Sequence, residues 1–573
     1  MKNLLKYMKQ YRLQAVLGPF FKLTEAMFEL FVPLVVADII DKGVGNGDKQ
    51  FIISRGILMA ALSVIGFICA LIAQYFAANA SVGFAANLRA ALFKKINNLN
   101  YTDLDKIGTS TLITRMTGDV NTVQTGVNLG LRLLLRSPFI VFGAMIMAFT
   151  VDTKSAFIFL ASIPVLAIIV VSIMTVTVPL YKKIQQKLDK VTLNTRESLK
   201  GVRVIRAYRQ ENDSIENFEQ NNSELTSLQN FVGKISALMN PLTYIVVNTA
   251  VILIIWIGGH RVYNGNLTQG QIVALYNYMS QILVELVKLA NMIMTVNKAL
   301  ASASRIDSVL AIESEKDIPT DETYLPDANY SIQFKNVCFT YSGAAESSLN
   351  NISFTADKGE HIGIIGTTGS GKSTLVNLIP HLYGATSGLV AVNGKDVKDY
   401  SDSELRSTIG IVPQKNVLFK GTIRENLLLG GKSATDEELW TALEAAQAKE
   451  IVLKKGGLDF EIQQGGRDLS GGQRQRLCIA RALVGNPEIL ILDDSASALD
   501  FKTEADLRHA MASLLQKPTI ITVSQRVSSV MNADKIIVLD DGESVGIGKH
   551  SELLETSDVY AEICHTQLEK EEM

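Results

Sequence analysis

The sequence predicts an all-α membrane domain of six helices followed by an α/β domain of the P-loop type. The residues before 300 hold most of the apolar excess of a chain that has 573 residues, 47% of them hydrophobic and 20% charged. The apolar run Ile362 to Ile365 leads into the glycine-rich stretch Gly366 to Ser373 and then into a helical pattern. Strand, glycine loop and helix in this order form a phosphate-binding P-loop.

Residues 1–12 form a basic segment with interspersed apolar residues. The pattern predicts an amphipathic helix on the inner membrane surface, or alternatively a solvated leader. The net charge of −2 argues against a basic nucleic-acid surface. The four cysteines lie too far apart in sequence to predict a disulfide framework or a zinc site.

Residues 13–300 are predicted to form the membrane domain, because six apolar stretches there approach the ~20 residues that cross a bilayer. Polar residues inside these stretches are expected either to face the bundle interior or a water-filled cavity, or to lie near the interfaces. The stretches run about Leu13 to Ile40, Ile52 to Val82, Leu133 to Val151, Ala156 to Leu180, Ile235 to Val262 and Ile272 to Met294, and the polar residues include Glu25, Glu29, Gln74, Asn248 and Glu285.

Two long connections, after the second and the fourth stretch, are rich in lysine and arginine, whereas the other loops are short and weakly charged. By the positive-inside rule these connections and both termini are cytoplasmic. Their helical patterning predicts that the membrane helices extend well beyond the bilayer.

Residues 301–330 are charged and contain prolines, which predicts a linker. Residues 331–573 are predicted to form the nucleotide-binding domain, where Val337, Phe339 and Tyr341 alternate as in a half-buried strand. In the P-loop, glycines allow backbone N–H groups to cradle phosphate, Lys372 reaches the β- and γ-phosphates, and the Ser373 hydroxyl coordinates Mg²⁺. The predicted ATP-binding residues here are Gly366, Thr367, Thr368, Gly369, Ser370, Gly371, Lys372, Ser373 and Thr374.

Four further motifs follow in order: Gln414 within GIVPQKNVLF, LSGGQ at Leu469 to Gln473, ILILD at Ile489 to Asp493, and SALD at Ser497 to Asp500. With the basic segments LRAALFKKINNL and NTRESLKGVRVIRAYRQE, they closely resemble ABC exporters that fuse six helices to a C-terminal ATPase. The resemblance implies ATP and Mg²⁺ as cofactors. It also implies coupling helices near Tyr101 to Ser110 and Ala207 to Asp213 that dock on nucleotide-binding domains.

The resemblance assigns a role to each site residue. Tyr341 stacks on adenine, and Ser373, Gln414 and Asp493 hold Mg²⁺, with Gln414 also sensing the attacking water. The signature residues Ser470, Gly471, Gly472 and Gln473 close over the γ-phosphate that the opposite subunit binds, and SALD crosses to that subunit. The catalytic positions are those of Gln414, Asp494 and Gln525.

Two catalytic positions depart from the family pattern. Asp494 stands where the family has the glutamate that polarises water, and Gln525 stands where it has the switch histidine. Aspartate is one methylene shorter, and general-base positioning is typically worth ~10²–10⁴ in rate. Glutamine donates and accepts hydrogen bonds, but unlike histidine it cannot take up a proton and become positively charged. With Gln464 replacing a further common glutamate, these changes predict a site that binds ATP and hydrolyses it slowly.

The sequence therefore predicts one half of a heterodimeric exporter of the multidrug type in a bacterial cytoplasmic membrane. Its intact signature would complete the competent site of a partner that carries the glutamate and the histidine. The expected substrate is an amphipathic drug or lipid-like molecule, and no nucleic acid is involved. Two alternatives remain: a homodimeric exporter of lipid or peptide, in which Asp494 suffices, and an ATP-gated regulatory subunit. The six stretches contradict a soluble ABC ATPase.

Overall fold

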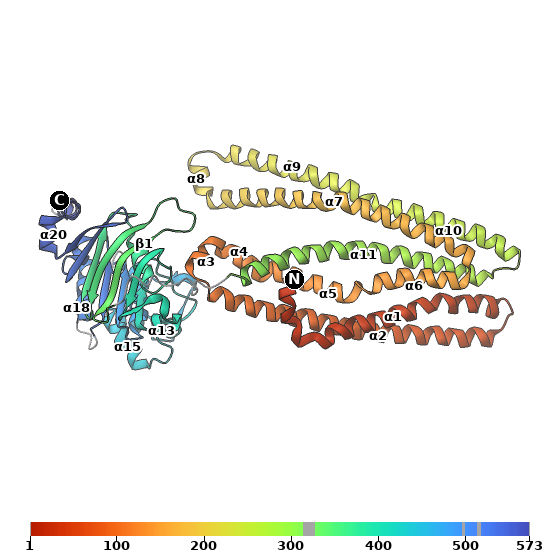
Figure 1. Ribbon diagram of the computed structural model, residues 1–573, viewed down its shortest axis with the longest axis horizontal. Helices are drawn as coiled ribbons and strands as arrows, with labels where there is room; N and C mark the ends of the chain where they lie inside the picture. The colour runs from red at the N-terminus through yellow and green to blue at the C-terminus, as the bar shows by residue number, and fades with distance from the viewer. Residues whose placement is uncertain (1, 313–326, 496–498, 513–516, 572–573) are drawn as a thin grey trace. The chain divides into compact units, whose positions relative to one another are not determined.

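The computed structural model describes residues 2–312, 327–495, 499–512 and 517–571 (Figure 1). Residue contacts divide the chain into two compact units. Unit 1 comprises Met1–Asn97 and Thr109–Ile312, and unit 2 comprises Asn98–Gly108 and Glu313–Met573. A short piece of the N-terminal half, Asn98–Gly108, thus packs with the C-terminal unit.

All regular elements among the described residues of unit 1 are helices, joined by short turns, which confirms the predicted helical membrane domain. By length and composition, five described helices can cross a membrane: Lys49–Asn97, Thr109–Val151, Thr153–Lys200, Glu211–Tyr263 and Gln269–Leu310. The first predicted stretch corresponds to α1 (Arg12–Asp38), which is helical but carries Lys22, Glu25 and Glu29. The elements are η1 (Lys2–Tyr11), α1, η2 (Ile39–Val44), α2 (Lys49–Asn97), α4 (Thr109–Thr114), η3 (Arg115–Asp119), α5 (Val120–Leu133), α6 (Arg136–Val151), α7 (Thr153–Lys200), α8 (Val202–Ala207), α9 (Glu211–Ala237), α10 (Met239–Tyr263) and α11 (Gln269–Leu310).

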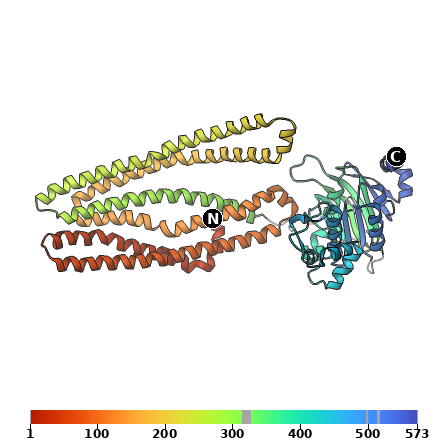
Figure 2. The ribbon, with the colours of Figure 1, turned by 180° about the vertical axis from the view of Figure 1, so that it is seen from behind.

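The two longest helices, α2 with 49 residues and α7 with 48, exceed what a bilayer needs. At about 1.5 Å per residue each spans about 70 Å, against about 30 Å of hydrocarbon, as the basic connections predict. Within unit 1, α1 lies beside α2, and α7 lies beside α9 and α10 (Figure 2).

The second predicted coupling tip, Ala207 to Asp213, is misplaced by a few residues. The short helix at this turn is α8, Val202–Ala207, and α9 already begins at Glu211. Gly201 ends α7, and Arg209, with φ of 55°, ends α8, because a left-handed residue cannot continue a right-handed helix. The periodicity of charged residues gave no sign of these two breaks.

The regular hydrogen bonding of the third predicted span is broken near its start. Helix α5 ends at Leu133 and α6 begins at Arg136, with Leu134 and Leu135 in a turn that keeps right-handed helical dihedral angles. Pro138, in the first turn of α6, has no N–H to donate to the carbonyl of Leu134, which explains the irregularity. Arg136 lies at this turn and is buried.

Unit 2 holds α3 (Tyr101–Ile107) and the α/β domain. A four-stranded sheet has the order β2-β1-β4-β5, and a six-stranded sheet has the order β12-β11-β3-β10-β9-β6. The strands are β1 (Tyr330–Phe339), β2 (Leu349–Asp357), β3 (His361–Gly366), β4 (Ser387–Val392), β5 (Lys395–Asp396), β6 (Ile409–Val412), β7 (Gly421–Thr422), β8 (Glu461–Ile462), β9 (Ile489–Asp493), β10 (Thr519–Val523), β11 (Lys535–Asp540) and β12 (Glu543–Gly548).

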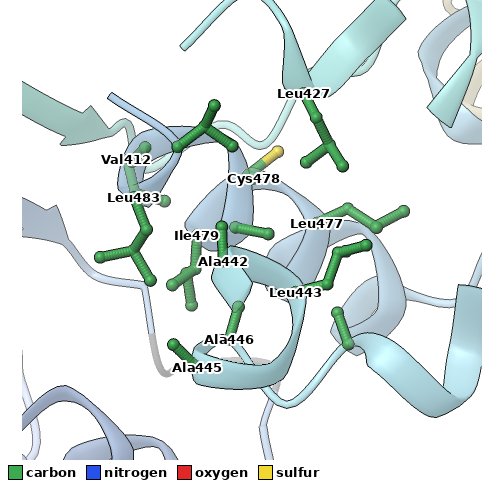
Figure 3. Close-up of a cluster of buried hydrophobic side chains, with 14 of the residues drawn as sticks. Val412, Leu427, Ala442, Leu443, Ala445, Ala446, Leu477, Cys478, Ile479 and Leu483 are labelled. Atoms are coloured by element: carbon green, nitrogen blue, oxygen red, sulfur yellow. The ribbon is translucent and has the colours of Figure 1, made fainter. Parts of the chain in front are cut away.

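The helices of the α/β domain include a group that surrounds α17 (Gly471–Leu483). Its residues Leu477, Ile479 and Leu483 pack with α15 and with Leu427 of α14 in one buried cluster (Figure 3). The helices are α12 (Lys372–Leu378), α13 (Asp402–Thr408), α14 (Ile423–Leu427), α15 (Asp436–Ala445), α16 (Lys449–Lys455), α17, α18 (Phe501–Ala512), α19 (Val527–Val530), α20 (His550–Thr556) and α21 (Asp558–Glu571), with the short turns η5 (Val397–Asp399) and η6 (Gln464–Gly466).

Candidate ATP site

The site is built on four neighbouring parallel strands. Strands β3, β10, β9 and β6 lie side by side and run in the same direction, so their carboxyl ends share one edge of the sheet. The P-loop follows β3, Gln525 follows β10, Asp493 ends β9, and Gln414 follows β6. Segments that are far apart in sequence therefore present their side chains in a row, which is where ligands bind in open α/β sheets.

The P-loop connects β3 to α12 and carries its lysine folded against its own backbone. The Lys372 ammonium donates to the carbonyl of Gly366 at 2.9 Å and also reaches the carbonyl of Thr367. At the tip, Thr367, Thr368 and Gly369 are exposed, while the side chain of Ser370 is buried. A loop in this shape turns backbone N–H groups outward at a helix N-terminus, which suits phosphate.

Gly371 shows why glycine is needed at the last position of the loop. Its φ of 92° lies in the left-handed region, and a Cβ there would come within 2.7 Å of the backbone oxygen of Ser348. Any larger residue would displace the start of α12 and with it Lys372.

Three predicted Mg²⁺ ligands are brought together. The Ser373 hydroxyl donates to Asp493 with 3.1 Å between Oγ and Oδ1, and Gln414 hydrogen-bonds to Asp493 through its backbone and to Asp494 through its side chain. Hydroxyl, carboxylate and amide oxygens are the donors that Mg²⁺ takes in proteins. The donor set therefore fits the ion.

The charged side chains of the ATP site, Asp493, Asp494 and Lys372, are largely buried. Burial raises the pKa of the Asp493 carboxyl, and neighbouring Asp494 raises it further, while the hydrogen bond from Ser373 lowers it. Burial likewise raises the pKa of Asp494 and lowers that of Lys372. Two adjacent carboxylates beside one ammonium favour an added cation, which is the charge that Mg²⁺ supplies.

Asp494 occupies an unusual backbone conformation. Its φ is 49°, in the left-handed region, and its N–H donates to the carbonyl of Val523 at 2.9 Å. Aspartate tolerates this region better than most residues. The backbone bond ties the catalytic position to the end of β10, directly before the loop that carries Gln525.

Gln525 lies in an exposed loop between β10 and α19. Its backbone carbonyl accepts a hydrogen bond from Gln567 Nε2 at 2.7 Å, and Gln567 Oε1 accepts from the N–H of Val527 at 2.9 Å. The C-terminal helix α21 thus holds the loop from both sides of Arg526. No sequence pattern predicts this contact.

Tyr341 follows β1 and lies beside the first turn of α12. Its hydroxyl is 3.0 Å from Thr374 Oγ1, and its ring makes edge contacts with Phe339 and Tyr383. Tyr383 in turn donates to Asp105 of α3 at 2.6 Å and contacts the ring of Tyr101. This aromatic cluster within unit 2 reaches from the predicted adenine position to the first predicted coupling tip.

The signature stands apart from the P-loop at the start of α17. Ser470 is the N-cap: its Oγ accepts from the N–H of Gln473, and Gln473 Oε1 accepts from the N–H of Ser470. Gly471 and Gly472 form the first turn and leave the helix N-terminus accessible, an arrangement suited to an anion. Of the SALD loop, Ser497 and Ala498 lie outside the described residues.

Sequence reasoning missed three residues. Gln475 is fully buried on α17 and points its Nε2 toward the carbonyl of Asp494 at 3.5 Å. Gln567 and Tyr383 were missed as well, because their contacts join segments far apart in the chain. Only Gln475 could have been found from the sequence, because it is a polar residue on the apolar side of the helical pattern of α17.

A P-loop, a buried strand ending in a carboxylate and an LSGGQ helix cap, fused to a helical membrane unit, define a membrane-transport ATPase. The chain belongs to the ABC transporter family. Residues 16–286 match the family model for the ABC transporter transmembrane region, and residues 349–497 match the ABC transporter model. The predicted fold class and ABC-type ATPase are thereby confirmed, and the chain has the half-transporter arrangement of a membrane domain fused to an ATPase domain.

Two curated relatives and one solved structure illustrate the similarity. The uncharacterized ABC transporter ATP-binding protein YfiB of Bacillus subtilis is 36% identical over 572 residues, covering 100% of this chain and 99% of that protein. The ATP-dependent lipid A-core flippase of Desulfotalea psychrophila is 33% identical over 475 residues, 83% of each chain. A bacterial Atm1-family ABC exporter with ATP bound shares the fold, with a TM-score of 0.82, 22% identity and 98% of both chains covered.

Proposed function

We propose that this chain is the subunit of a heterodimeric bacterial ABC exporter whose own P-loop site binds ATP but hydrolyses it slowly. The observation that carries the proposal is the pair Asp494 and Gln525. Asp494 follows β9 and Gln525 follows the neighbouring parallel strand β10, so both lie at the same edge of the sheet. Asp494 is held by its backbone in the left-handed region, so the shorter side chain cannot be compensated by a free shift of the chain. Gln525 supplies a neutral amide in place of a histidine.

The intact signature supports the second half of the proposal. Ser470 caps α17 with a complete capping box, so this chain offers a well-formed helix N-terminus to a nucleotide bound elsewhere. A partner with a glutamate and a histidine at the two positions would then hold the competent catalytic site. In the family mechanism two ATPase domains close on ATP as a pair. Such a partner would supply the second ATPase domain of this pair.

In the proposed cycle, ATP at both sites favours closure of the two ATPase domains, and the coupling tips transmit this closure to the membrane helices. A ligand shifts such an equilibrium only by its differential affinity for the two states. Lys372 and the P-loop amides bind the phosphates, and Ser373, Gln414 and Asp493 would hold Mg²⁺, which neutralises phosphate charge. Hydrolysis at the partner's site resets the pair.

The proposed substrate is an amphipathic drug or lipid-like molecule, exported across a bacterial cytoplasmic membrane with both termini inside. The orientation follows from the basic connections. The resemblance to a relative named as a lipid A-core flippase supports a lipid-like substrate. In this proposal residues 13–300 form the membrane domain, 331–573 the ATPase domain and 301–330 the linker. Helix α11 continues to Leu310, and residues 313–326 lie outside the described part of the chain.

Steady-state ATP hydrolysis by the chain alone in lipid nanodiscs tests the proposal, with bound nucleotide quantified to verify folding. We expect ATP binding with turnover far below about 1 s⁻¹, the low end of ordinary enzymes. The double variant Asp494→Glu with Gln525→His should raise turnover by a factor of about 10² or more.

The matched control is Glu425→Gln, which changes a carboxylate in the same domain, at the N3 position of α14. This control should leave turnover unchanged. Brisk hydrolysis by the unmodified chain would contradict the proposal and identify a homodimeric exporter in which Asp494 is sufficient. Nucleotide binding without ATP-driven transport alongside any partner would identify a gated regulatory subunit.

A further inference from the structure

A charged cluster lies inside the membrane unit, where α1, α6 and α11 meet (Figure 1). Arg136, only 7% exposed, donates to Glu285 Oε1 at 2.6 Å and to Glu29 Oε2 at 2.7 Å. Glu285, 3% exposed, also accepts from Ser137 Oγ at 2.8 Å and from Lys288 Nζ at 2.9 Å. Charged side chains in membrane spans are costly and mark binding sites and pathways.

The backbone beside the cluster is also irregular. Leu134 and Leu135 keep right-handed helical dihedral angles, and the N–H groups of Leu134 and Phe139 bond to the carbonyls of Gly130 and Leu135. Pro138 has no N–H to donate to the carbonyl of Leu134, so one helical hydrogen bond is missing at this point. The irregular turn and the charges coincide at one place.

A cavity of about 420 Å³ opens beside this cluster between α1 and α11. The α1 wall is apolar except for Glu29, and the α11 wall is polar except for Val284. The lining residues are Glu29, Val32, Pro33, Val36, Asn277, Ser280, Gln281, Val284, Glu285 and Lys288. Such a mixed lining suits an amphipathic molecule rather than a purely apolar or purely ionic one.

The lining contains an acceptor that lacks a donor. Gln281 Oε1 is buried and has no hydrogen-bond partner among the described residues. A buried acceptor left unpaired costs free energy that a bound N–H group would recover. Nearby, Glu29 keeps 40% of its side chain exposed although one of its oxygens is bound to Arg136.

The lining also contains a partly exposed cation. Lys288 keeps 46% of its side chain exposed while one hydrogen bond ties its ammonium to Glu285. An ammonium has three donors, so two stay available to an anionic group. The exposed charged groups of the lining are thus the Glu29 carboxylate on α1 and the Lys288 ammonium on α11, and the buried amide oxygen of Gln281 also lies on α11.

The depth of the cluster is the same on all three helices. At about 1.5 Å per residue, Arg136 lies about 22 Å from the far end of α6, Glu285 about 24 Å from the start of α11, and Glu29 about 24 Å from the turn after η2. In a hydrocarbon layer of about 30 Å, the charges lie toward the side on which α11 continues to Leu310. In the proposed topology this is the cytoplasmic leaflet.

We propose that this cavity binds the head group of a zwitterionic amphiphile that has a primary ammonium and a phosphate, drawn from the cytoplasmic leaflet. Gln281 Oε1 and Glu29 accept from the ammonium, Lys288 binds the phosphate, and the α1 wall contacts the apolar chain. The inference rests on the proposed export of amphipathic molecules and specifies the substrate class. The N–H groups of the ammonium distinguish this ligand from a trimethylated head group of equal charge.

Equilibrium binding to the purified full-length chain in a nonionic detergent tests the inference. The probes are radiolabelled lysophosphatidylethanolamine, lysophosphatidylcholine and lysophosphatidylglycerol with the same acyl chain. We expect the ethanolamine lipid to bind about tenfold more tightly than the choline lipid, the ratio that one charge-assisted hydrogen bond supplies. Equal Kd values for these two probes would overturn the inference.

Variants assign the effect to the cavity. Gln281→Leu should lower the preference for ethanolamine over choline, because Glu29 remains as the one acceptor, whereas Gln281→Glu keeps both acceptors and should retain the full preference. Lys288→Gln should weaken both of these phospholipids while leaving their ratio unchanged. The matched control is Asn248→Leu, an amide on α10 that does not line the cavity. Retention of the full preference in Gln281→Leu would overturn the inference, and if that variant does not fold, the comparison of probes on the unmodified chain decides.

The binding assay contains no ATP, so its outcome is independent of the proposed function. ATP-driven transport without a head-group preference would remove this inference and leave the exporter in place. A head-group preference in a chain that never transports with any partner would support this inference and contradict the proposed export.

Discussion

Gln567 on the C-terminal helix and Gln525 in the loop after β10 are joined by a hydrogen bond of 2.7 Å from side-chain Nε2 to backbone oxygen. The same side chain accepts from the amide of Val527 at 2.9 Å. Because both bonds go to the backbone, they fix the loop whatever side chain stands at position 525. Helix α21 is therefore part of the support of the ATP site.

Replacement of Gln567 by alanine should loosen this loop. Two partly exposed hydrogen bonds contribute about 1–2 kcal/mol, so local opening should become about tenfold or more frequent. Hydrogen exchange of the Val527 amide measures this directly. Thr566→Ala, on the next residue of the same helix, should leave the exchange rate unchanged; an equal acceleration in that control would show fraying of α21 instead.

The affinity for ATP should depend on the ring of Tyr341 more than on its hydroxyl. Tyr341→Ala should weaken ATP binding by about 0.5–1.5 kcal/mol, the range of an aromatic pair. Tyr341→Phe loses only the contact with Thr374 Oγ1 and should bind ATP nearly as well as the unmodified chain. Fluorescent-nucleotide titration distinguishes the two, and equal losses in both variants would argue against stacking.

Asp493 should give the nucleotide-free protein a distinctive pH dependence. Its pKa is raised by burial, so its favourable contribution to stability is full below the ordinary value of 3.8 and is lost as the pH rises through the raised pKa. Asp493→Asn should therefore raise the unfolding temperature of the nucleotide-free protein near pH 7.

The same substitution should remove the extra stabilisation that Mg²⁺ adds to ATP, because a carboxylate ligand is lost. Thermal unfolding across pH 5–8, with ATP and with or without Mg²⁺, measures both effects. An unchanged response to Mg²⁺ in the variant would exclude Asp493 as a ligand.

The contact between Tyr383 and Asp105 should matter for coupling rather than for ATP binding. Tyr383→Phe removes a hydrogen bond of 2.6 Å to a carboxylate, an interaction worth about 1.5–3 kcal/mol when well buried and less at this partly buried site. We expect unchanged nucleotide affinity and reduced stimulation of hydrolysis by transported substrate when the chain is paired with its partner. Loss of nucleotide affinity would show that Tyr383 supports the adenine site instead.

Much of the fold and site could be predicted from sequence because the signals are local. The P-loop is a contiguous run next to its strand and helix, and Ser470 and Gln473 announce a helix start by their spacing alone. The long basic helices were predictable from charge and periodicity. The irregular turn before Arg136 was missed, although Pro138, four residues after Leu134, is a sequence signal for it.

Contacts between residues far apart in the sequence could not be predicted either. Gln567 with Gln525 and Tyr383 with Asp105 join ordinary-looking residues through the topology of the sheet. A glutamine in a polar C-terminal helix carries no sign that its partner is a backbone amide. The α8 turn was displaced from its predicted place because Gly201 and Arg209 set its ends by backbone conformation, which charge patterns do not report.

The membership of Asn98–Gly108 in unit 2 has a consequence for the synthesis of the chain. Asp105 leaves the ribosome 278 residues before its partner Tyr383. At about 5–20 residues per second, α3 waits roughly 14–56 s for the surface on which it packs. During that time Tyr101 and its neighbours are open to chaperones and proteases. A chain truncated before the P-loop domain would lack the partner of Asp105 and Tyr101 altogether.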